Sequence, residues 1–287
     1  MSAPAAPRIA YVNGRYLPLA EATLPIMDRG FLFGDGIYEV TAVLGDHFVD
    51  NEPHLARLDR SLKAIGIRNP HTIPEWTAIQ RELVRQNDLK QGTVYIEVTR
   101  GTYEREFTCP DDIAPNVVMF TQAKNLLANP MAETGAAVIT VDDLRWARRD
   151  IKSVALLAQV LAKFEARRAG VAEAVMLEDG VVTEGASSTF FILSSAGALV
   201  TRALSNSVLP GVTRSSVMRL ARETGLQVEE RPFSRQEMLA AREVFYTSAS
   251  SFVMPVVAVD GEKISGGRPG PITKKLRAIY LEEAQKG

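Results

Sequence analysis

Lys152 is the residue whose type and surroundings most suggest covalent chemistry. It lies in residues 145–153 (RWARRDIKS), where three arginines come shortly before it. Nearby cations and removal from water both lower the pKa of a lysine, and a neutral amine can form a Schiff base. A solvated basic surface is the ordinary interpretation of such a run, and the segment alone does not exclude it.

Glu184 offers a second chemical group, in residues 183–188 (TEGASS). Small residues beside a carboxylate allow a flat ligand to approach the chain closely. Next to a pyridine nitrogen, a carboxylate keeps that nitrogen protonated and makes the ring an electron sink. An exposed acid in a turn fits the same residues.

Three further features suit a phosphate group. Residues 209–214 (LPGVTR) lead into a predicted helix, whose first N–H groups can bind phosphate. Residues 247–251 (TSASS) end a predicted strand with hydroxyls and small side chains. Arg57, on the polar side of another predicted helix, can form a charge-assisted bidentate bond to phosphate. Each feature is common, and a surface role for Arg57 fits equally well.

Residues 28–40 (DRGFLFGDGIYEV) carry three glycines ahead of a predicted strand. The glycines predict a tight turn. The functional interpretation is a loop over a ligand, with the Tyr38 hydroxyl pointing into the site.

The elements that must position these residues are mixed helices and strands. Apolar spacings of three and four predict several helices, among them one from about residue 153. In that helix we expect Leu156, Leu157, Val160, Leu161 and Phe164 to be buried. Regular β-α-β alternation is missing, which favours an α+β or α/β fold with mixed sheets and flanking helices.

Composition excludes several classes of function. The 287 residues carry a net charge of −1, which argues against a nucleic-acid partner. One cysteine and three histidines without ligand spacing predict no metal site and no Ser-His-Asp hydrolase. No apolar run approaches the roughly 18 residues of a membrane helix, so we expect a cytoplasmic protein without a membrane partner. Dinucleotide and Walker phosphate loops are also missing.

Four segments together resemble the class IV aminotransferases, the fold-type IV pyridoxal-phosphate enzymes, and most closely the D-amino-acid aminotransferases. They are residues 29–40 (RGFLFGDGIYEV), 150–153 (DIKS), 183–188 (TEGASS) and 209–214 (LPGVTR). They are specific when they occur together in this order, and the resemblance extends over about residues 8–282.

The resemblance implies an architecture. It gives a small N-terminal domain and a larger C-terminal domain. The run of polar and small residues over 122–135 predicts the linker between them, which places the domains at residues 1–121 and 136–287. The cofactor, pyridoxal 5'-phosphate, would lie at the domain interface, and the protein would be a homodimer.

The resemblance also assigns roles to single residues. Lys152 would be the catalytic Schiff-base lysine, and Glu184 the partner of the pyridine nitrogen. The residues expected to hold the phosphate are Arg57, Val212, Thr213, Ala249 and Ser250. Those expected to line the substrate pocket are Tyr38, Val40, Arg105 and Phe107.

The implied reaction moves an amino group from a D-amino acid such as D-alanine to a 2-oxo acid such as 2-oxoglutarate or pyruvate. In the D-amino-acid enzymes an Arg-x-His pair binds the substrate α-carboxylate together with the pocket tyrosine. Here Arg105 is kept, but Phe107 replaces the histidine. An Arg–carboxylate bond contributes about 1.5–3 kcal/mol. We therefore expect D-amino acids to remain substrates with weaker carboxylate binding, and (R)-primary amines to become candidate substrates.

Related activities remain open as alternatives. They are branched-chain L-amino-acid transamination, (R)-amine transamination and aminodeoxychorismate lysis. A pyridoxal-phosphate-binding regulatory or carrier protein is the non-enzymatic alternative. The pair Lys152 and Glu184 argues against it, because binding alone needs no protonated ring nitrogen.

Overall fold

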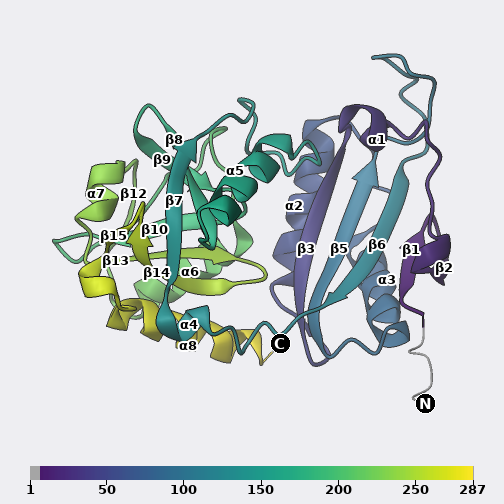
Figure 1. Cartoon of the computed structure of the whole chain (residues 1–287). Helices are drawn as coiled ribbons and strands as arrows, with labels where there is room; N and C mark the ends of the chain where they lie inside the picture. Colours follow the sequence, from purple (N-terminus) through teal and green to yellow (C-terminus); the bar gives the residue numbers. More distant parts are fainter. Residues whose placement is uncertain (1–6, 287) are drawn as a thin grey trace. The chain divides into compact units, whose positions relative to one another are not determined.

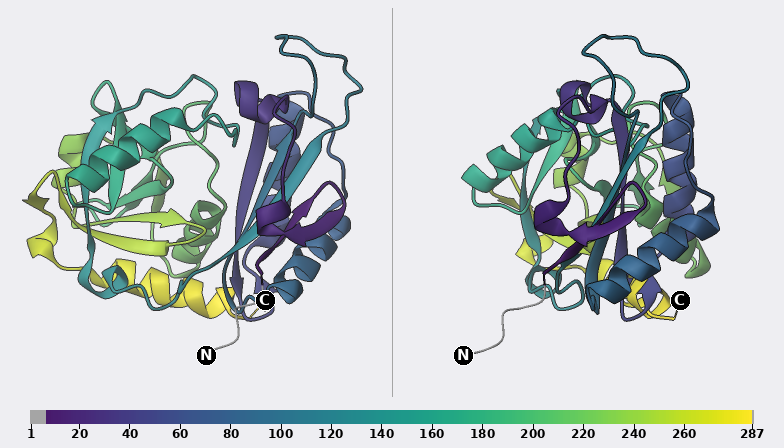
Figure 2. Two further views of the ribbon diagram at one scale, coloured as in Figure 1. Left: turned by 45° about the vertical axis from the view of Figure 1, so that its right-hand side comes forward. Right: turned by 90° about the vertical axis from the view of Figure 1, so that its right-hand side faces the viewer.

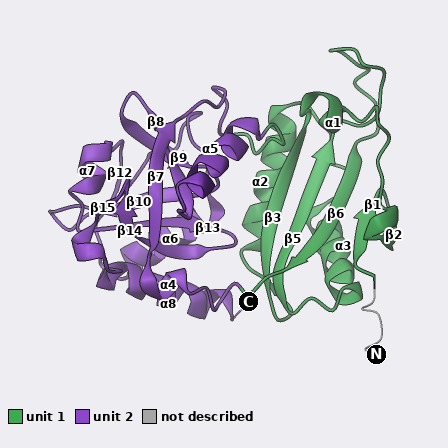
Figure 3. Cartoon of the chain, viewed as in Figure 1, with its two compact units in different colours: residues 1–125, 151–155 green, residues 126–150, 156–287 purple. Residues whose placement is uncertain are grey.

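The computed structural model describes residues 7–286 and divides the chain into two compact units (Figure 3). The first unit contains residues up to 125 together with 151–155, and the second contains 126–150 and the chain from 156 onwards. The excursion at 151–155 was not expected from the sequence. It belongs to the first unit because Ile151 is buried in that unit's core and residue 153 pairs with Ile37.

The first unit is built on a six-stranded antiparallel sheet in the order β2-β1-β6-β5-β3-β4. Figure 2 shows helices α2 and α3 together on one face of this sheet. The elements of the unit are β1 (Ile9–Val12), β2 (Arg15–Pro18), η1 (Leu19–Glu21), α1 (Arg29–Phe33), β3 (Gly36–Leu44), β4 (His47–Phe48), α2 (Asn51–Ala64), α3 (Ile73–Gln86), β5 (Gln91–Thr99) and β6 (Asn116–Ala123).

The core of the first unit lies between the sheet and helices α2 and α3. Val94, Ile96 and Val98 alternate along β5 and are fully buried against the leucine stripe of α2, which includes Leu58. Strand side chains two residues apart share a face, and this periodicity selects the buried set. Full burial of each such side chain contributes about 1.5–3 kcal/mol to stability. The core therefore holds β5 in place, and β5 in turn holds its long neighbour β3 through the sheet.

The second unit contains a nine-stranded mixed sheet. Its order is β12-β11-β10-β13-β14-β7-β8-β9, with β15 paired to β14. All of these strands except β11 are labelled in Figure 1. The pairs β11/β12, β14/β7 and β7/β8 are parallel and the others antiparallel. The strands are β7 (Ala136–Asp142), β8 (Glu173–Glu178), β9 (Val181–Gly185), β10 (Thr189–Leu193), β11 (Leu199–Thr201), β12 (Val228–Glu230), β13 (Glu243–Ser248), β14 (Phe252–Val259) and β15 (Glu262–Lys263).

Helices flank this second sheet, and its main core lies among β10, β13 and β14. The expected class of mixed sheets with flanking helices is confirmed. The helices are α4 (Met131–Thr134), α5 (Leu157–Arg168), α6 (Val212–Glu223), α7 (Arg235–Leu239), η2 (Ser265–Gly267) and α8 (Pro271–Ala284). Within residues 7–286, no helix combines the length and apolar character that a membrane span requires.

Helix α5 contradicts the predicted burial of its apolar residues. The side that packs on the sheet consists of small residues, Ala162 and Ala166, which contact β8. Small side chains let the helix lie close to the strand, so the larger residues point outward. Leu156, the first of the five residues predicted to be buried, is half-buried. The other four are 45–72% exposed, contrary to the prediction: Leu157, Val160, Leu161 and Phe164.

Candidate active site

Lys152 is held against the start of β3 by main-chain contacts within the first unit. The Tyr38 N–H donates to the Lys152 carbonyl at 2.9 Å, and the Lys152 N–H donates to the Ser61 hydroxyl at 3.3 Å. The Lys152 Nζ lies 4.0 Å from the centroid of the Tyr38 ring. The structure thus brings together two residues that are 114 positions apart in the chain and that the sequence singled out independently.

Strand β3 presents different residues on its two faces. Tyr38 and Val40 are half-buried on one face, where the Tyr38 ring stacks on Tyr95 at a centroid distance of 5.6 Å. Successive side chains of a strand point to opposite faces, so the intervening Glu39 points the other way. Glu39 is completely buried and meets residues from α2.

Arg57 forms a bidentate ion pair with Glu39 that the sequence did not predict. The Arg57 Nε donates to Glu39 Oε1 at 2.6 Å and Nη2 donates to Oε2 at 2.8 Å, while His54 Nδ1 lies 2.8 Å from Oε2. Burial alone would raise the pKa of Glu39, but Arg57 and His54 outweigh it and hold the pKa far below its usual value. The acid and its two partners therefore form one buried charged group. A possible signal in the sequence was the i, i+3 spacing of His54 and Arg57, which places both on one helix face.

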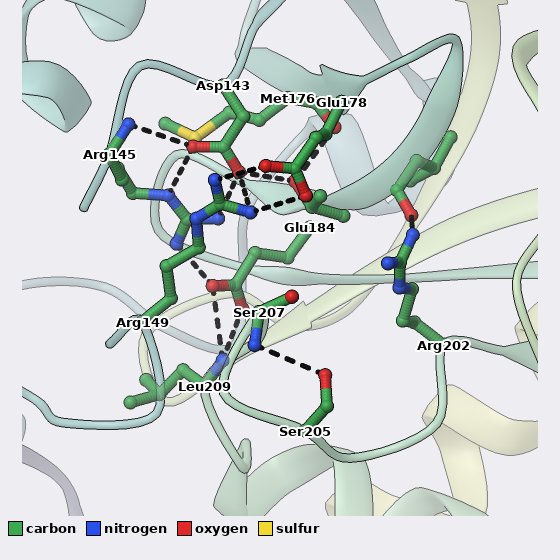
Figure 4. Close-up of polar contacts among 12 residues, drawn as sticks. Asp143, Arg145, Arg149, Met176, Glu178, Glu184, Arg202, Ser205, Ser207 and Leu209 are labelled. Atoms are coloured by element: carbon green, nitrogen blue, oxygen red, sulfur yellow. Dashed lines mark hydrogen bonds and ion pairs between the residues drawn. The ribbon is translucent and has the colours of Figure 1, made fainter. Parts of the chain in front are cut away.

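Glu184 lies at the end of β9 in the second unit, within a buried charge network (Figure 4). Its carboxylate accepts a hydrogen bond from Arg145 Nη1. The Leu209 N–H lies 3.2 Å from each of its two oxygens. Burial raises the pKa of Glu184, and Arg145 and the Leu209 N–H oppose this effect. Sequence reasoning singled out Glu184 as a candidate but not Asp143, which binds the other side of Arg145.

Helix α6 begins at Val212 with Gly211 as its N-cap, and no described side chain caps it. An uncapped N-terminus leaves main-chain N–H groups to bind an anion. A Cβ on Gly211 would lie 2.7 Å from the Thr189 hydroxyl, so the loop approaches β10 more closely than other residues allow. Thr213 and Val212, both expected at the phosphate, are buried in the first turn.

A buried hydroxyl beside this helix has no hydrogen-bond partner among residues 7–286. It is the Thr247 Oγ1, at the end of β13, and Thr247 pairs across the sheet with Thr189. The turn 249–251 follows, and the Ser251 N–H bonds to the Ser248 hydroxyl at 3.0 Å. An unsatisfied buried hydroxyl costs free energy unless a ligand pairs with it. The donors around α6 and this turn therefore fit a phosphate group.

The segment with Arg105 and Phe107 is held by helix α1. Arg29 is buried and donates to the Glu106 carbonyl at 2.7 Å and to the Phe107 carbonyl at 3.0 Å. The Arg105 guanidinium lies 5.7 Å from the centroid of the Phe33 ring, and Phe107 is 85% exposed. The glycine-rich residues 28–40, expected as a loop over a ligand, thus form a short helix and strand that support another loop.

Each unit holds part of the expected site. Lys152, Tyr38, Val40, Arg57, Arg105 and Phe107 belong to the first unit, and Glu184, Val212, Thr213, Ala249 and Ser250 belong to the second. Among the described residues, no group of three or more His, Cys, Asp or Glu side chains is arranged to bind a metal ion.

Known proteins are similar to this sequence over nearly its full length. The family described as Amino-transferase class IV matches residues 36–259. D-alanine aminotransferase of Bacillus licheniformis is 38% identical over 267 residues, which cover 92% of this chain and 93% of that protein. The enzyme of the same name from Listeria monocytogenes serotype 4b is 36% identical over 274 residues, covering 95% and 94%.

Solved structures share the fold. The branched-chain amino acid aminotransferase of Escherichia coli superposes with a TM-score of 0.90 at 25% identity, covering 96% of this chain and 94% of that chain. The branched-chain enzyme of T.th., solved with pyridoxamine 5'-phosphate, has a TM-score of 0.89 at 25% identity, covering 98% and 95%. The expected fold type, enzyme class and cofactor are confirmed. The chain therefore belongs to the class IV aminotransferases, which are pyridoxal-phosphate enzymes.

Proposed function

We propose that this enzyme transfers the amino group of a D-amino acid such as D-alanine to a 2-oxo acid such as 2-oxoglutarate or pyruvate. The observation that carries the proposal is the likeness to D-alanine aminotransferases, at 38% identity over more than nine-tenths of both chains. The structural likeness to branched-chain enzymes is at 25% identity. It supports branched-chain L-amino-acid transamination as the second candidate.

Lys152 is the residue that we propose to bind the cofactor covalently and to remove the proton from the substrate Cα. When bound, pyridoxal 5'-phosphate supplies an aldehyde carbon that condenses with amines and a ring that accepts electrons from the substrate. The main-chain hydrogen bonds of Lys152 to β3 and α2 hold its Cα in place, while the Tyr38 ring lies against its side-chain amine. This arrangement limits the positions that the amine can reach, as proton transfer requires.

Glu184 is proposed to accept a hydrogen bond from the protonated ring nitrogen. A carboxylate offers about four acceptor positions, and the donors around Glu184 are Arg145 and the Leu209 N–H. Capacity therefore remains for one more N–H donor.

The phosphate is proposed to bind at the N-terminus of α6. Val212 and Thr213 would donate through their main-chain N–H groups, and the turn with Ala249 and Ser250 would add further donors. The unpaired Thr247 hydroxyl supports this position. Arg57 would contribute positive charge, reduced by its ion pair with Glu39.

The substrate carboxylate is proposed to bind Arg105, with Tyr38, Val40 and Phe107 lining the pocket. An arginine forks toward a carboxylate with two parallel N–H donors, whereas a phenylalanine contributes none. Loss of the second donor weakens D-amino-acid binding and favours apolar groups. This supports (R)-primary amines as additional donors.

A homodimer is the oligomeric state that we propose. The side of α5 formed by Leu157, Val160, Leu161 and Phe164 is 45–72% exposed in the single chain, and contiguous exposed apolar groups mark interaction surfaces. Light scattering should give twice the 31.4 kDa mass of the chain, and Leu161→Glu should shift it toward one chain mass. A single-chain mass for the unchanged protein would contradict a dimer. A cytoplasmic location stays a prediction.

The proposed activity is tested by single half-reactions of the cofactor-loaded protein. D-alanine, L-leucine and (R)-1-phenylethylamine are added separately, without an acceptor, while the cofactor absorbance is followed. We expect D-alanine to change the absorbance fastest and to release pyruvate, and Lys152→Ala to abolish the change. Faster reaction with L-leucine would favour the branched-chain candidate. A coloured protein that responds to no amine would support a carrier, and pyruvate from aminodeoxychorismate without an acceptor would indicate a lyase.

A further inference from the structure

Asp143 is a buried carboxylate that has no role in the reaction as described above, yet it adjoins the residue that binds Glu184. Its side chain is 0% exposed. It accepts Arg145 Nε on Oδ1 at 2.9 Å and Arg145 Nη2 on Oδ2 at 2.6 Å, and the Thr183 hydroxyl donates to Oδ2 at 2.6 Å (Figure 4). This bidentate contact leaves Arg145 Nη1 as the nitrogen that donates to Glu184. Asp143 therefore determines how the guanidinium meets Glu184.

The buried charges around Glu184 balance. Asp143 and Glu184 share Arg145, and Arg149 lies 3.4 Å from Asp143. These two carboxylates and two guanidinium groups are at most 6% exposed, whereas Glu178, 2.8 Å from Arg149, is 44% exposed. A buried charge without a partner is unfavourable. Loss of the Asp143 charge would leave a net positive charge beside Glu184, which disfavours a protonated pyridine nitrogen there.

We propose that Asp143 is a positioning residue that acts through Arg145 to keep the cofactor's ring nitrogen protonated. The inference rests on the proposed contact between Glu184 and that nitrogen. Without the charge of Asp143, the buried network carries a net positive charge, which opposes a second cation beside Glu184. Arg145 also loses its anchor and can turn both arms of its fork onto Glu184, where it competes with the ring N–H.

The charge balance can be tested with four variants of the cofactor-loaded enzyme. Asp143→Asn gives the buried network a net charge of +1, and Arg145→Gln gives it a net charge of −1. The double variant Asp143→Asn/Arg145→Gln returns the net charge to zero. Glu178→Gln is the matched control, because it removes the same charge from a side chain that is 44% exposed, where water screens it. The ring nitrogen is followed by the ¹⁵N chemical shift of labelled pyridoxal phosphate, with its Kd and the kcat and KM for D-alanine.

Asp143→Asn should move the ¹⁵N signal toward the unprotonated position and weaken cofactor binding. It should lower kcat about tenfold or more, as a pKa change of about one unit implies, with KM changed less than about threefold. The double variant should regain the protonated signal, and Glu178→Gln should behave as the unchanged enzyme. If Asp143 had a purely structural role, the double variant would not regain the protonated signal, because it removes a second buried group.

A protonated ring nitrogen in Asp143→Asn, or a double variant that is unprotonated like the single one, would overturn the inference. If Asp143→Asn does not fold, the double variant and Arg145→Gln decide, because both should keep the nitrogen protonated. An unprotonated nitrogen in the unchanged enzyme would instead contradict the proposed role of Glu184. That result would count against the proposed function before Asp143 is considered.

Discussion

Substitution of Arg57 by alanine tests two contributions of its buried guanidinium, one to the stability of the fold and one to cofactor binding. Arg57 pairs with Glu39, whose side chain is 0% exposed, through two hydrogen bonds of 2.6 and 2.8 Å. Arg57→Ala leaves the Glu39 carboxylate buried, with the His54 ring still beside it. Breaking a buried ion pair from one side costs about 3–5 kcal/mol, which is a large part of a typical total stability of about 5–15 kcal/mol.

The second contribution is to the cofactor. If Arg57 also binds the phosphate, its loss removes a charge-assisted bond of about 1.5–3 kcal/mol, which corresponds to roughly a 10- to 150-fold higher Kd. Adding Glu39→Gln to Arg57→Ala removes the stranded charge. We expect this double variant to recover stability but to keep the weakened cofactor binding.

Urea unfolding of the cofactor-free protein measures the first contribution. The chain has two tryptophans, and Trp76 is fully buried in the first unit, so a Trp146→Phe background makes the emission specific for that unit. Titration with pyridoxal phosphate measures the second contribution. A stability loss below about 1 kcal/mol for Arg57→Ala would refute the buried-pair argument, as would the failure of Glu39→Gln to restore stability.

Further predictions concern pH, the substrate loop and the helix N-terminus. Burial lowers the pKa of His54 below its ordinary 6.5, although Glu39 opposes the change, so the unfolded chain takes up a proton that the folded chain does not. Stability should therefore fall as pH falls through about 6.5, by at most about 1.4 kcal/mol per pH unit from this group, and His54→Gln should flatten that slope in urea unfolding at several pH values. Phe107→His should raise kcat/KM for D-alanine about tenfold and lower it for (R)-1-phenylethylamine, because a polar donor replaces an apolar ring; equal changes for both amines would contradict this assignment. Gly211→Ala should weaken cofactor binding about tenfold or more, since its Cβ would lie 2.7 Å from the Thr189 hydroxyl; unchanged affinity in a cofactor titration would exclude α6 as the phosphate site.

The sequence singled out candidate residues because each motif is local. Lys152, Glu184 and the segment 209–214 were suggested by neighbouring residues, and their expected roles came from the resemblance of the four segments taken together. The fold class followed from hydrophobic periodicity and from the order of helices and strands. These signals extend over a few turns of chain, which is the range over which sequence patterns are informative.

The partners of these residues were missed because they come from distant parts of the chain. Glu39 meets Arg57 through packing of α2 on β3, and Asp143 is linked to Glu184, 41 positions away, through Arg145. No spacing rule connects such pairs. The burial prediction for helix α5 was wrong for another reason. An apolar stripe predicts that the residues are covered, but it does not tell whether the same chain or another molecule covers them.

The most direct measurement of the central claim is the transfer of ¹⁵N from D-alanine to 2-oxoglutarate by the cofactor-loaded enzyme. The product is separated by chiral chromatography and its label measured by mass spectrometry, with Lys152→Ala as the control. The account predicts labelled D-glutamate and pyruvate in equal amounts from the unchanged enzyme and neither from the variant. Labelled L-glutamate, or pyruvate formed without labelled glutamate, would contradict it.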